Sequence, residues 1–253
     1  KFDEGKNILT HSPAVLQSRK MTLQLLLSDH NMDCLACSRN GSCELQELCK
    51  ELGVDDTTFF EGEKNEYDID YSSKHMFRDN NKCIHCRRCI AACDKLQGIG
   101  VIGANNRGFK TSIDCAFDLD LAETACVSCG QCITACPTGA LAEKDDTDKV
   151  WDALADPEKV VVVQTAPAVR ASLGEDFGYP MGTPVEGKMV AALRRLGFNV
   201  VFDTKFGADL TIMEESHEFL DRVTNGGVLP MITSCSPGWI RFCEAYFPEF
   251  IPK

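Results

Sequence analysis

The sequence predicts a chain of two parts, a cysteine-rich α+β part followed by a part of the α/β class. Three observations lead to this prediction: the number of cysteines, their position, and the pattern that follows them. The 253 residues include fifteen cysteines, of which thirteen lie between positions 34 and 136 and only two, Cys235 and Cys243, come later. Behind the cysteine-rich segment, β-branched runs alternate with amphipathic helical segments, which is the pattern of α/β folds.

The bulk composition excludes several classes of partner. The net charge is −12, whereas a surface that binds nucleic acid or an anionic membrane needs an excess of Lys and Arg. No apolar run approaches the roughly 18 residues of a membrane span, and the charged start KFDEGKNILT does not resemble a signal peptide. We therefore expect a cytoplasmic protein with no nucleic-acid partner and no membrane span, whose cysteines hold metal rather than disulfides.

Two cysteine runs share one spacing, with steps of three, three and four residues. They are CIHCRRCIAAC at 83–93 and CVSCGQCITACP at 126–137. This is the pattern of bacterial ferredoxins, in which three cysteines of one run and the fourth of the other hold each 4Fe–4S cluster. The pattern assigns one cluster to Cys83, Cys86, Cys89 and Cys136, and the other to Cys126, Cys129, Cys132 and Cys93. Zinc is the alternative, but four-ligand zinc sites usually combine two separated C-x2-C pairs.

A third set of donors precedes these runs, in the segment HNMDCLACSRNGSC. The set comprises His30, Cys34, Cys37 and Cys43. Three cysteines and one histidine form a common structural zinc site, so zinc stays open on the chemistry of the donors. The neighbouring runs favour a third 4Fe–4S cluster, and an imidazole should raise its potential relative to a cluster with four thiolates. Cys49, on the helix that follows, is interpreted as a packed thiol rather than a ligand.

Four features near these runs are interpreted as structural. The segment GIGVIG at 98–103 matches the G-x-G-x-x-G pattern of dinucleotide sites. It does not follow a predicted strand within a strand–helix–strand unit, so glycines in a hairpin are the better interpretation. Cys115 fits neither run and is interpreted as a spare thiol, and His85 is expected to point to solvent. Near the start, NILTH at 7–11 is predicted to be a strand and the leucine-rich segment after it a helix.

From about residue 149 the sequence has the pattern of a parallel α/β sheet. The run KVVVVQTAP is typical of a strand buried on both faces, and two more strands are predicted at NVVFDT and LPMITSC. Helices are predicted over PVEGKMVAALRRLGF, ending at Gly197, over ADLTIMEESHEFLDRVTN, and over PGWIRFCEAYF with Pro237 in the first turn. Because ligands of such sheets bind beyond the carboxyl ends of strands, the pattern points to Thr233, Ser234 and Cys235. The alternative for Cys235 is an ordinary buried cysteine.

At the level of whole motifs, the chain resembles the modular iron-only (FeFe) hydrogenases along essentially its full length. The segments that carry the resemblance are HNMDCLACSRNGSCELQ, the two cysteine runs, TAPAVRASLGEDFG, VFDTKFGADLTIMEE and PMITSCSPGW. The first two are similar also to the large iron–sulfur subunit of respiratory NADH dehydrogenase and to some formate dehydrogenases. The last two are much more specific to the hydrogenase catalytic domain.

The resemblance implies four regions. Residues 1–29 would be the tail of an N-terminal domain of 2Fe–2S type, and 30–75 a small domain whose 4Fe–4S cluster is held by one histidine and three cysteines. Residues 76–146 would form a ferredoxin-like domain with two 4Fe–4S clusters, and 147–253 the start of the α/β catalytic domain. On this interpretation the chain is an internal fragment of a longer subunit, because the family's later cysteine motifs do not occur before Lys253.

The resemblance also implies residues for H2 chemistry. The family's H-cluster joins a 4Fe–4S cubane to a two-iron subsite, and Cys235 matches the cysteine that relays protons to it. Glu215 and Glu218 match the acidic residues of the outward proton path, which requires groups that both give and accept protons. The alternative is that both glutamates are ordinary solvated positions on a helix. Ser236 stands where the family signature TSCCPxW has a cysteine ligand of the cubane, so either Cys235 substitutes for it or the cofactor site is altered.

The resemblance implies that electrons pass through three 4Fe–4S clusters to the H-cluster of the full subunit. Expected partners are ferredoxin or NAD(P)H-oxidising flavin and iron–sulfur subunits in a multi-subunit, electron-bifurcating complex. One alternative is an electron-transfer subunit of a complex similar to NADH dehydrogenase or formate dehydrogenase, which would lack ADLTIMEE and TSCSPGW. A binding protein organised by zinc is a second alternative, and it would be colourless.

Overall fold

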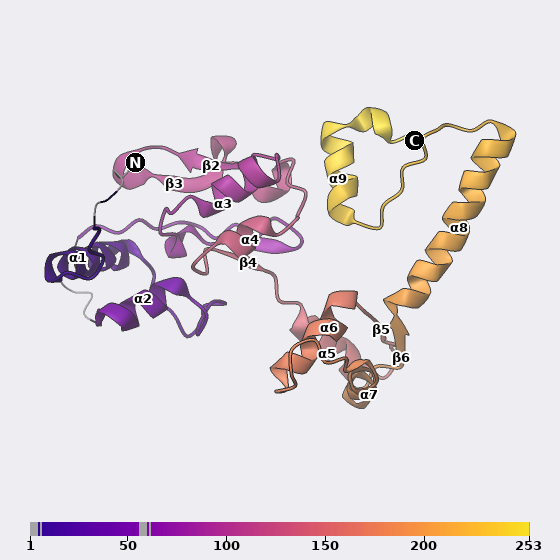
Figure 1. Cartoon of the computed structure of the whole chain (residues 1–253), viewed down its shortest axis with the longest axis horizontal. Coiled ribbons are helices and arrows are strands. Elements are labelled where there is room, and N and C mark those ends of the chain that lie inside the picture. The colour runs from indigo at the N-terminus through magenta and orange to yellow at the C-terminus, as the bar shows by residue number, and fades with distance from the viewer. Residues whose placement is uncertain (1–4, 6, 56–59, 61, 253) are drawn as a thin grey trace. The chain divides into compact units, whose positions relative to one another are not determined.

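The computed structural model describes residues 5, 7–55, 60 and 62–252, which form two compact units (Figure 1). The first unit contains the chain up to Lys144 and, after an interruption, Ser236–Phe247. The second unit contains Asp145–Cys235 and the residues from Pro248 onward. A late segment of the sequence therefore belongs to the cysteine-rich unit. Within the described ranges, no helix combines the length and apolarity needed to cross a bilayer.

Two helices lie beside the third set of donors, the one that contains His30. Helix α1 covers Pro13–Asp29 and α2 covers Glu44–Leu52. Ser12 caps α1, since its Oγ accepts a hydrogen bond from the Val15 N–H at 3.4 Å, and a proline follows at the first helical position. Two leucines one turn apart on α1 pack with α2 in a small core: Leu23 and Leu27.

The strand predicted for residues 7–11 is wrong, whereas the helix predicted after it is confirmed. Residues 7–9 have no regular structure, and a bend at Thr10–Ser12 leads into α1. An extended segment needs a neighbouring strand for its backbone groups, and in the described part of the chain this segment pairs with none.

Two short antiparallel sheets and two short helices form the rest of the first unit. The sheets pair β1 (Met76–Arg78) with β4 (Leu141–Glu143), and β2 (Ile102–Asn105) with β3 (Ser112–Cys115). The helices are α3 (Arg88–Ala91), which continues as a π-helical turn at Ala92–Leu96, and α4 (Gln131–Ala135). The glycine-rich segment 98–103 leads into the β2–β3 hairpin, so the hairpin interpretation is confirmed.

Apolar side chains and cysteines share one core in this part of the unit. Met76 and Leu121 are 2% and 1% exposed. The core comprises Met76, Cys89, Cys93, Ile102, Ile113, Cys115, Leu121, Cys132, Cys136, Ala140 and Leu141. Four predicted cluster ligands belong to this core, whereas Cys86 and Cys129 of the same two runs are exposed.

The second unit is α/β, as predicted. Its elements are α5 (Thr147–Ala155), β5 (Val162–Thr165), α6 (Pro167–Asp176), α7 (Glu186–Leu196), β6 (Val200–Asp203) and α8 (Thr204–Asn225). Strands β5 and β6 are parallel, with Val163 opposite Val201. Helix α7 ends at Gly197 in the left-handed region, as predicted, and Asp203 caps α8 by accepting a hydrogen bond from the Lys205 N–H at 3.0 Å.

One strand prediction for this unit is wrong, and a second is wrong in part. Residues 229–235 form no strand, because Pro230 has no N–H to donate to a sheet. Strand β5 is shorter than KVVVVQTAP and is not buried on both faces, since Val162 is 52% exposed. A two-stranded sheet offers each strand only one paired edge, so the apolar run alone overstated the burial.

Helix α9 (Pro237–Tyr246) returns the chain to the first unit. Ser236 caps it, since its Oγ accepts a hydrogen bond from the Trp239 N–H at 3.3 Å, and Pro237 occupies the first turn as predicted. Short 3-10 turns complete the structure at Asn80–Lys82, Gly108–Lys110, Ala116–Asp118, Leu121–Glu123 and Pro248–Phe250.

Candidate iron–sulfur sites

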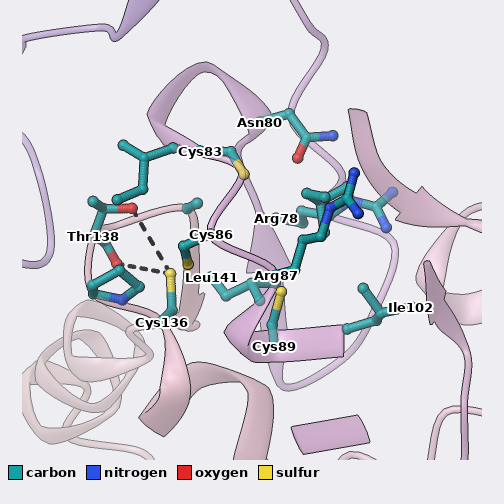
Figure 2. Close-up of a pocket in the computed structure, with 14 residues that line it drawn as sticks. Arg78, Asn80, Cys83, Cys86, Arg87, Cys89, Ile102, Cys136, Thr138 and Leu141 are labelled. Atoms are coloured by element: carbon teal, nitrogen blue, oxygen red, sulfur yellow. Dashed lines mark hydrogen bonds between the residues drawn. The ribbon is translucent and has the colours of Figure 1, made fainter. Parts of the chain in front are cut away.

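Four cysteines from the two runs line one cavity of the first unit. Their sulfur atoms surround the cavity in Figure 2, and they belong to Cys83, Cys86, Cys89 and Cys136. Ile102 and Leu141 supply part of its apolar wall, and the Cys136 thiol donates a hydrogen bond to the Thr138 carbonyl at 3.1 Å. The structure thus brings together the four cysteines that the spacing assigned to one cluster, while their ligation of iron stays a prediction.

The backbone of each run turns through the left-handed region at the same two places. In the first run His85 and Arg87 have φ of 53° and 63°, and in the second Ser128 and Gly130 have φ of 55° and 73°. This conformation is costly for residues other than glycine, so its repetition marks a constraint of the fold. It directs the His85 N–H at the sulfur of Cys83, over 3.4 Å, where a hydrogen bond stabilises a thiolate.

Burial strongly disfavours charged thiolates at these positions. Burial, together with the charges of neighbouring thiolates, raises the pKa of Cys83 to about 12, that of Cys89 to about 11 and that of Cys132 to about 12. Metal ligands must nevertheless be thiolates, and a bound cation supplies the opposite charge that holds them in this form. The donor set therefore fits a positively charged iron group whose binding releases protons.

The remaining cysteines of the runs form a second group. Cys126 interacts electrostatically with Cys93 and Cys129, and Cys132 interacts with all three. Cys132 also interacts with Cys89 of the first group. Cys93 and Cys132 lie in the same core as Cys89 of the first group, and Cys126 packs against this core, while Cys129 is exposed.

The third predicted set lines a separate cavity beside α1 and α2. It is lined by His30, Cys34, Cys37 and Cys43. His30 is 8% exposed, and its buried Nδ1 has no hydrogen-bond partner among the residues that the structure describes. Burial, and after it the charge of Lys82, lowers the pKa of His30, which favours the neutral imidazole that a metal requires. A buried and unpartnered ring nitrogen is what a histidine ligand offers, so His30 fits this role, although no three of these donors converge on a single metal ion in the described residues.

One segment separates the third cavity from the first. Thr138 lines both cavities, and Gly139 lines the third. The segment is held on both sides, since the Glu44 N–H donates to the Pro137 carbonyl at 3.1 Å and the Thr138 hydroxyl donates to the Lys82 carbonyl at 2.7 Å. Thr138 thus forms part of the wall of both predicted cluster sites.

Replacing Gly139 with alanine should disrupt the third site. A Cβ at this position would lie far inside contact distance of the Cys37 sulfur, and the tethered backbone cannot move away. We expect the variant to lose about four irons per chain, because a 4Fe–4S cluster without one of its ligands is released or degraded. Iron and sulfide analysis of anaerobically purified protein measures this.

Gly103→Ala is the matched control, since a Cβ there meets nothing within 4 Å. Unchanged iron in the Gly139 variant would mean that Cys37 needs no fixed position.

The predicted proton-transfer residues are not assembled in the described residues. Cys235 is exposed in the segment before α9. Glu215 and Glu218 lie three residues apart on α8, and Glu218 forms an ion pair with Arg222. No contact joins either glutamate to Cys235 in the described part of the chain, and the Ser236 hydroxyl serves as a helix cap. The roles assigned to these four residues stay predictions.

Sequence reasoning missed two residues of α9 that bind the backbone at or near the second cysteine group. Arg241 Nη1 donates to the Cys126 carbonyl at 3.4 Å and to the Ser128 Oγ at 3.1 Å. The Tyr246 hydroxyl donates to the Ile99 carbonyl at 2.9 Å, and the Ile99 N–H donates to the Cys93 carbonyl at 3.0 Å. Helix α9 therefore fixes the backbone beside two predicted ligands from opposite runs.

The structure corrects the interpretation of His85 and adds detail to that of Cys115. The expectation that His85 points to solvent is wrong, because its Nε2 is buried and unpartnered within the described residues, a consequence of the left-handed turn. Cys115 lies outside both groups, as the spacing indicated, but it is a core residue with 0% exposure. Its sulfur accepts a hydrogen bond from Arg78 at 3.4 Å.

Protein-family models match both the cysteine-rich part and the α/β part of the chain. Residues 159–253 match the C-terminal domain of the iron-only hydrogenase large subunit. Residues 82–140 match the 4Fe–4S dicluster domain. Residues 19–58 match the iron–sulfur binding region of NADH-ubiquinone oxidoreductase G. These matches confirm the fold class and the presence of iron–sulfur regions, and they favour iron–sulfur over zinc in the His30 region.

Individual relatives extend the similarity along the chain. The NADP-reducing hydrogenase subunit HndD of Solidesulfovibrio fructosivorans is 51% identical over 250 residues, which is 96% of this chain and 43% of the relative. Iron hydrogenase 1 of Clostridium pasteurianum is 43% identical, over 99% of this chain and 44% of the relative. The chain thus spans less than half the length of both.

A crystal structure of an NAD+-reducing [NiFe]-hydrogenase in the H2-reduced state also resembles part of the chain. Its TM-score is 0.50 at 27% identity, covering 53% of this chain and 57% of the other. Taken with the family match over residues 159–253 and the two hydrogenases similar over nearly the whole sequence, the motifs have one explanation. The chain belongs to the iron-only hydrogenase family.

Proposed function

We propose that this chain is the electron relay and the first part of the catalytic lobe of an FeFe-hydrogenase subunit. The reaction would be the interconversion of two protons and two electrons with H2. The proposal is supported by the neighbourhood of the three predicted ligand sets: two of them line cavities that share Thr138, two have members in one core, and α9 binds the Cys126 loop. Such an arrangement suits electron transfer, because single electrons pass readily only between clusters that lie close together.

The adjoining walls give the relay an order. The His30 site shares Thr138 with the Cys83 site, and the Cys83 site meets the Cys126 site through Cys89 and Cys132. The Cys126 site in turn lies against α9. We therefore assign the His30 site as the entry, the Cys83 site as the middle and the Cys126 site as the exit of the relay.

The chain's own residues would support each electron step. Three 4Fe–4S clusters would supply one-electron redox chemistry, and the buried cysteines would hold them away from water. At the exit, the Arg241 guanidinium lies beside the Cys126 loop, where its positive charge favours the more negative, reduced form of the site. At the entry, a neutral imidazole from His30 in place of a thiolate would raise the potential.

Residues near the end of the chain would serve the H-cluster of the full subunit. Cys235 would pass protons to it, with Glu215 and Glu218 leading outward along α8. Ser236 would not provide a strong ligand, because a hydroxyl is a poor ligand for iron–sulfur clusters and this one caps α9. Support for these roles comes from the motif VFDTKFGADLTIMEE and from the family match over residues 159–253.

The electron donor would be ferredoxin or a flavin and iron–sulfur subunit that oxidises NAD(P)H, within a multi-subunit complex. The name of the relative HndD, an NADP-reducing hydrogenase subunit, supports the second donor. A reducing compartment such as the cytoplasm suits a protein that depends on free thiols for cluster assembly. The match over residues 19–58, taken by itself, favours a second candidate, an electron-transfer subunit of an NADH dehydrogenase-like complex.

Iron and sulfide analysis tests the relay directly. Protein purified without oxygen should contain about twelve irons and as many sulfides per chain, since each of three cubanes has four of each. Low-temperature paramagnetic resonance of the reduced protein should show interacting clusters, because the sites adjoin. Four irons or fewer per chain, or no inorganic sulfide, would refute the relay and with it the proposed function.

A further inference from the structure

The entry site has more donors than a four-iron cluster needs. In addition to the four predicted ligands, Cys49 lines the same cavity. It lies one turn after Leu45 on α2, and both side chains line the cavity from that helix. Leu45 is only 3% exposed, so this face of α2 is directed inward, towards the site and the core beside it.

The fifth thiol lines the same cavity as two predicted ligands, Cys34 and Cys43, and it is partly buried there. Thiolate is the donor type that iron–sulfur clusters prefer, so Cys49 has the chemistry of a further ligand.

The histidine corner of the same site depends on a single nitrogen. His30 follows the last turn of α1, and its Nδ1 is buried in the described structure without any hydrogen-bond partner. The neighbouring backbone is anchored, because the Asn31 N–H donates to the Asn81 carbonyl at 2.8 Å. The cavity thus contains one neutral donor and one surplus thiol beside three cysteines of the predicted set.

We propose that Cys49 is an alternative ligand of the entry cluster, able to take the iron that His30 would otherwise hold. This inference rests on the proposed function. In the exchange, the iron–nitrogen bond breaks and releases a neutral imidazole, the Cys49 thiol loses its proton to water, and an iron–sulfur bond forms. No electron is transferred. The exchanged cluster carries one more thiolate, and its reduction potential is lower.

Three variants of the whole chain test the exchange: His30→Ala, Cys49→Ser and the double variant. His30→Ala should keep about twelve irons per chain, with the potential of the entry cluster shifted downward, because a thiolate replaces an imidazole. The double variant should lose about four irons, or about one if only the unligated corner is released. Cys49→Ser alone should keep the iron content and the potential of the unmodified protein.

Potentiometric titration followed by paramagnetic resonance, with iron analysis, measures these outcomes. The middle and exit clusters and the far-ultraviolet circular dichroism report on folding in every variant, and Cys243→Ser, at a buried thiol of α9, is the matched control. Any of three results overturns the inference. These are loss of the entry cluster in His30→Ala, an unchanged potential of that cluster in His30→Ala, and a double variant whose iron content and potential equal those of His30→Ala. Loss of the entry cluster in Cys49→Ser alone would make Cys49 a permanent ligand and would overturn it as well.

These results are separate from a failure of the relay. If the unmodified protein lacks iron or sulfide, the proposed function itself is wrong. If the unmodified protein has its full iron content and only the variants deviate from expectation, the role of Cys49 alone is wrong.

Discussion

Replacing Arg78 with methionine is expected to destabilise the cysteine-rich unit by about 3–5 kcal/mol, the cost of removing one partner from a buried ion pair. Arg78 lies in β1 and forms ion pairs with Asp70, at 3.2 Å, and with Asp114 of β3. The side chains of Arg78 and Asp70 are only 7% and 6% exposed. Without the guanidinium, two buried carboxylates would face each other, and the link between the two small sheets would be lost.

The two carboxylates respond differently to this environment. Burial acts to raise the pKa of Asp70, but hydrogen bonds from Ser72 and from the Leu121 N–H, together with Arg78, lower it below its usual value. Burial raises the pKa of Asp114 and outweighs the opposing effect of Arg78. We therefore expect Asp114 to take up a proton in the variant, which relieves the repulsion between the two carboxylates.

Urea unfolding without oxygen, followed by circular dichroism, measures the loss. Arg88→Met is the matched control, since Arg88 pairs with Glu44 and both side chains are half exposed. Such surface pairs contribute at most about 1 kcal/mol. An Arg78 variant no less stable than the Arg88 variant would show that the buried triad does not hold the sheets together.

Replacing Cys89 with serine should remove the middle cluster and interrupt the relay. Cys89 is buried at the start of α3, lines the first cavity and interacts with Cys132 of the next group. A serine hydroxyl is too weak an acid to replace the thiolate, so we expect a loss of about four irons per chain. Electron transfer from the entry to the exit should fall sharply, because the remaining clusters no longer adjoin.

Iron analysis and stopped-flow reduction with a chemical donor measure the two effects separately. Cys115→Ser is the control, because Cys115 is equally buried in the same unit and lies outside both cysteine groups. It should keep its iron. Retention of about twelve irons by the Cys89 variant would remove Cys89 from the ligand set of the middle site.

The grouping of the cysteines could be predicted from sequence because cluster ligation is a local constraint. Steps of three and four residues place donors on one loop and one short helix, and the second run repeats the pattern. The fold of the second unit could be predicted for a similar reason, since β5, α7 and β6 each have a distinct periodic signal. His30 was predicted from its spacing to Cys34, although its buried nitrogen became visible only in the structure.

The parts that failed depend on contacts distant in sequence. Arg241 reaches a carbonyl 115 residues earlier, and nothing in the helix PGWIRFCEAYF signals that partner. The segment 229–235 has the composition of a strand, but Pro230 cannot donate to a sheet. His85 is turned inward by a left-handed backbone conformation, which could not be predicted from a histidine at this position. In each case the local structure is determined by a tertiary contact or a backbone conformation, and not by the hydrophobic pattern.

The return of α9 to the cysteine-rich unit has a consequence for biosynthesis. The whole of Asp145–Cys235 is translated between Lys144 and the residues that cover the Cys126 loop. While the ribosome makes that stretch, the nascent chain can already complete the cavities lined by His30 and Cys83, but the backbone beside Cys93 and Cys126 lacks Tyr246 and Arg241. On the proposed function, the site beside α9 would therefore be the last of the three to receive all the residues that surround it.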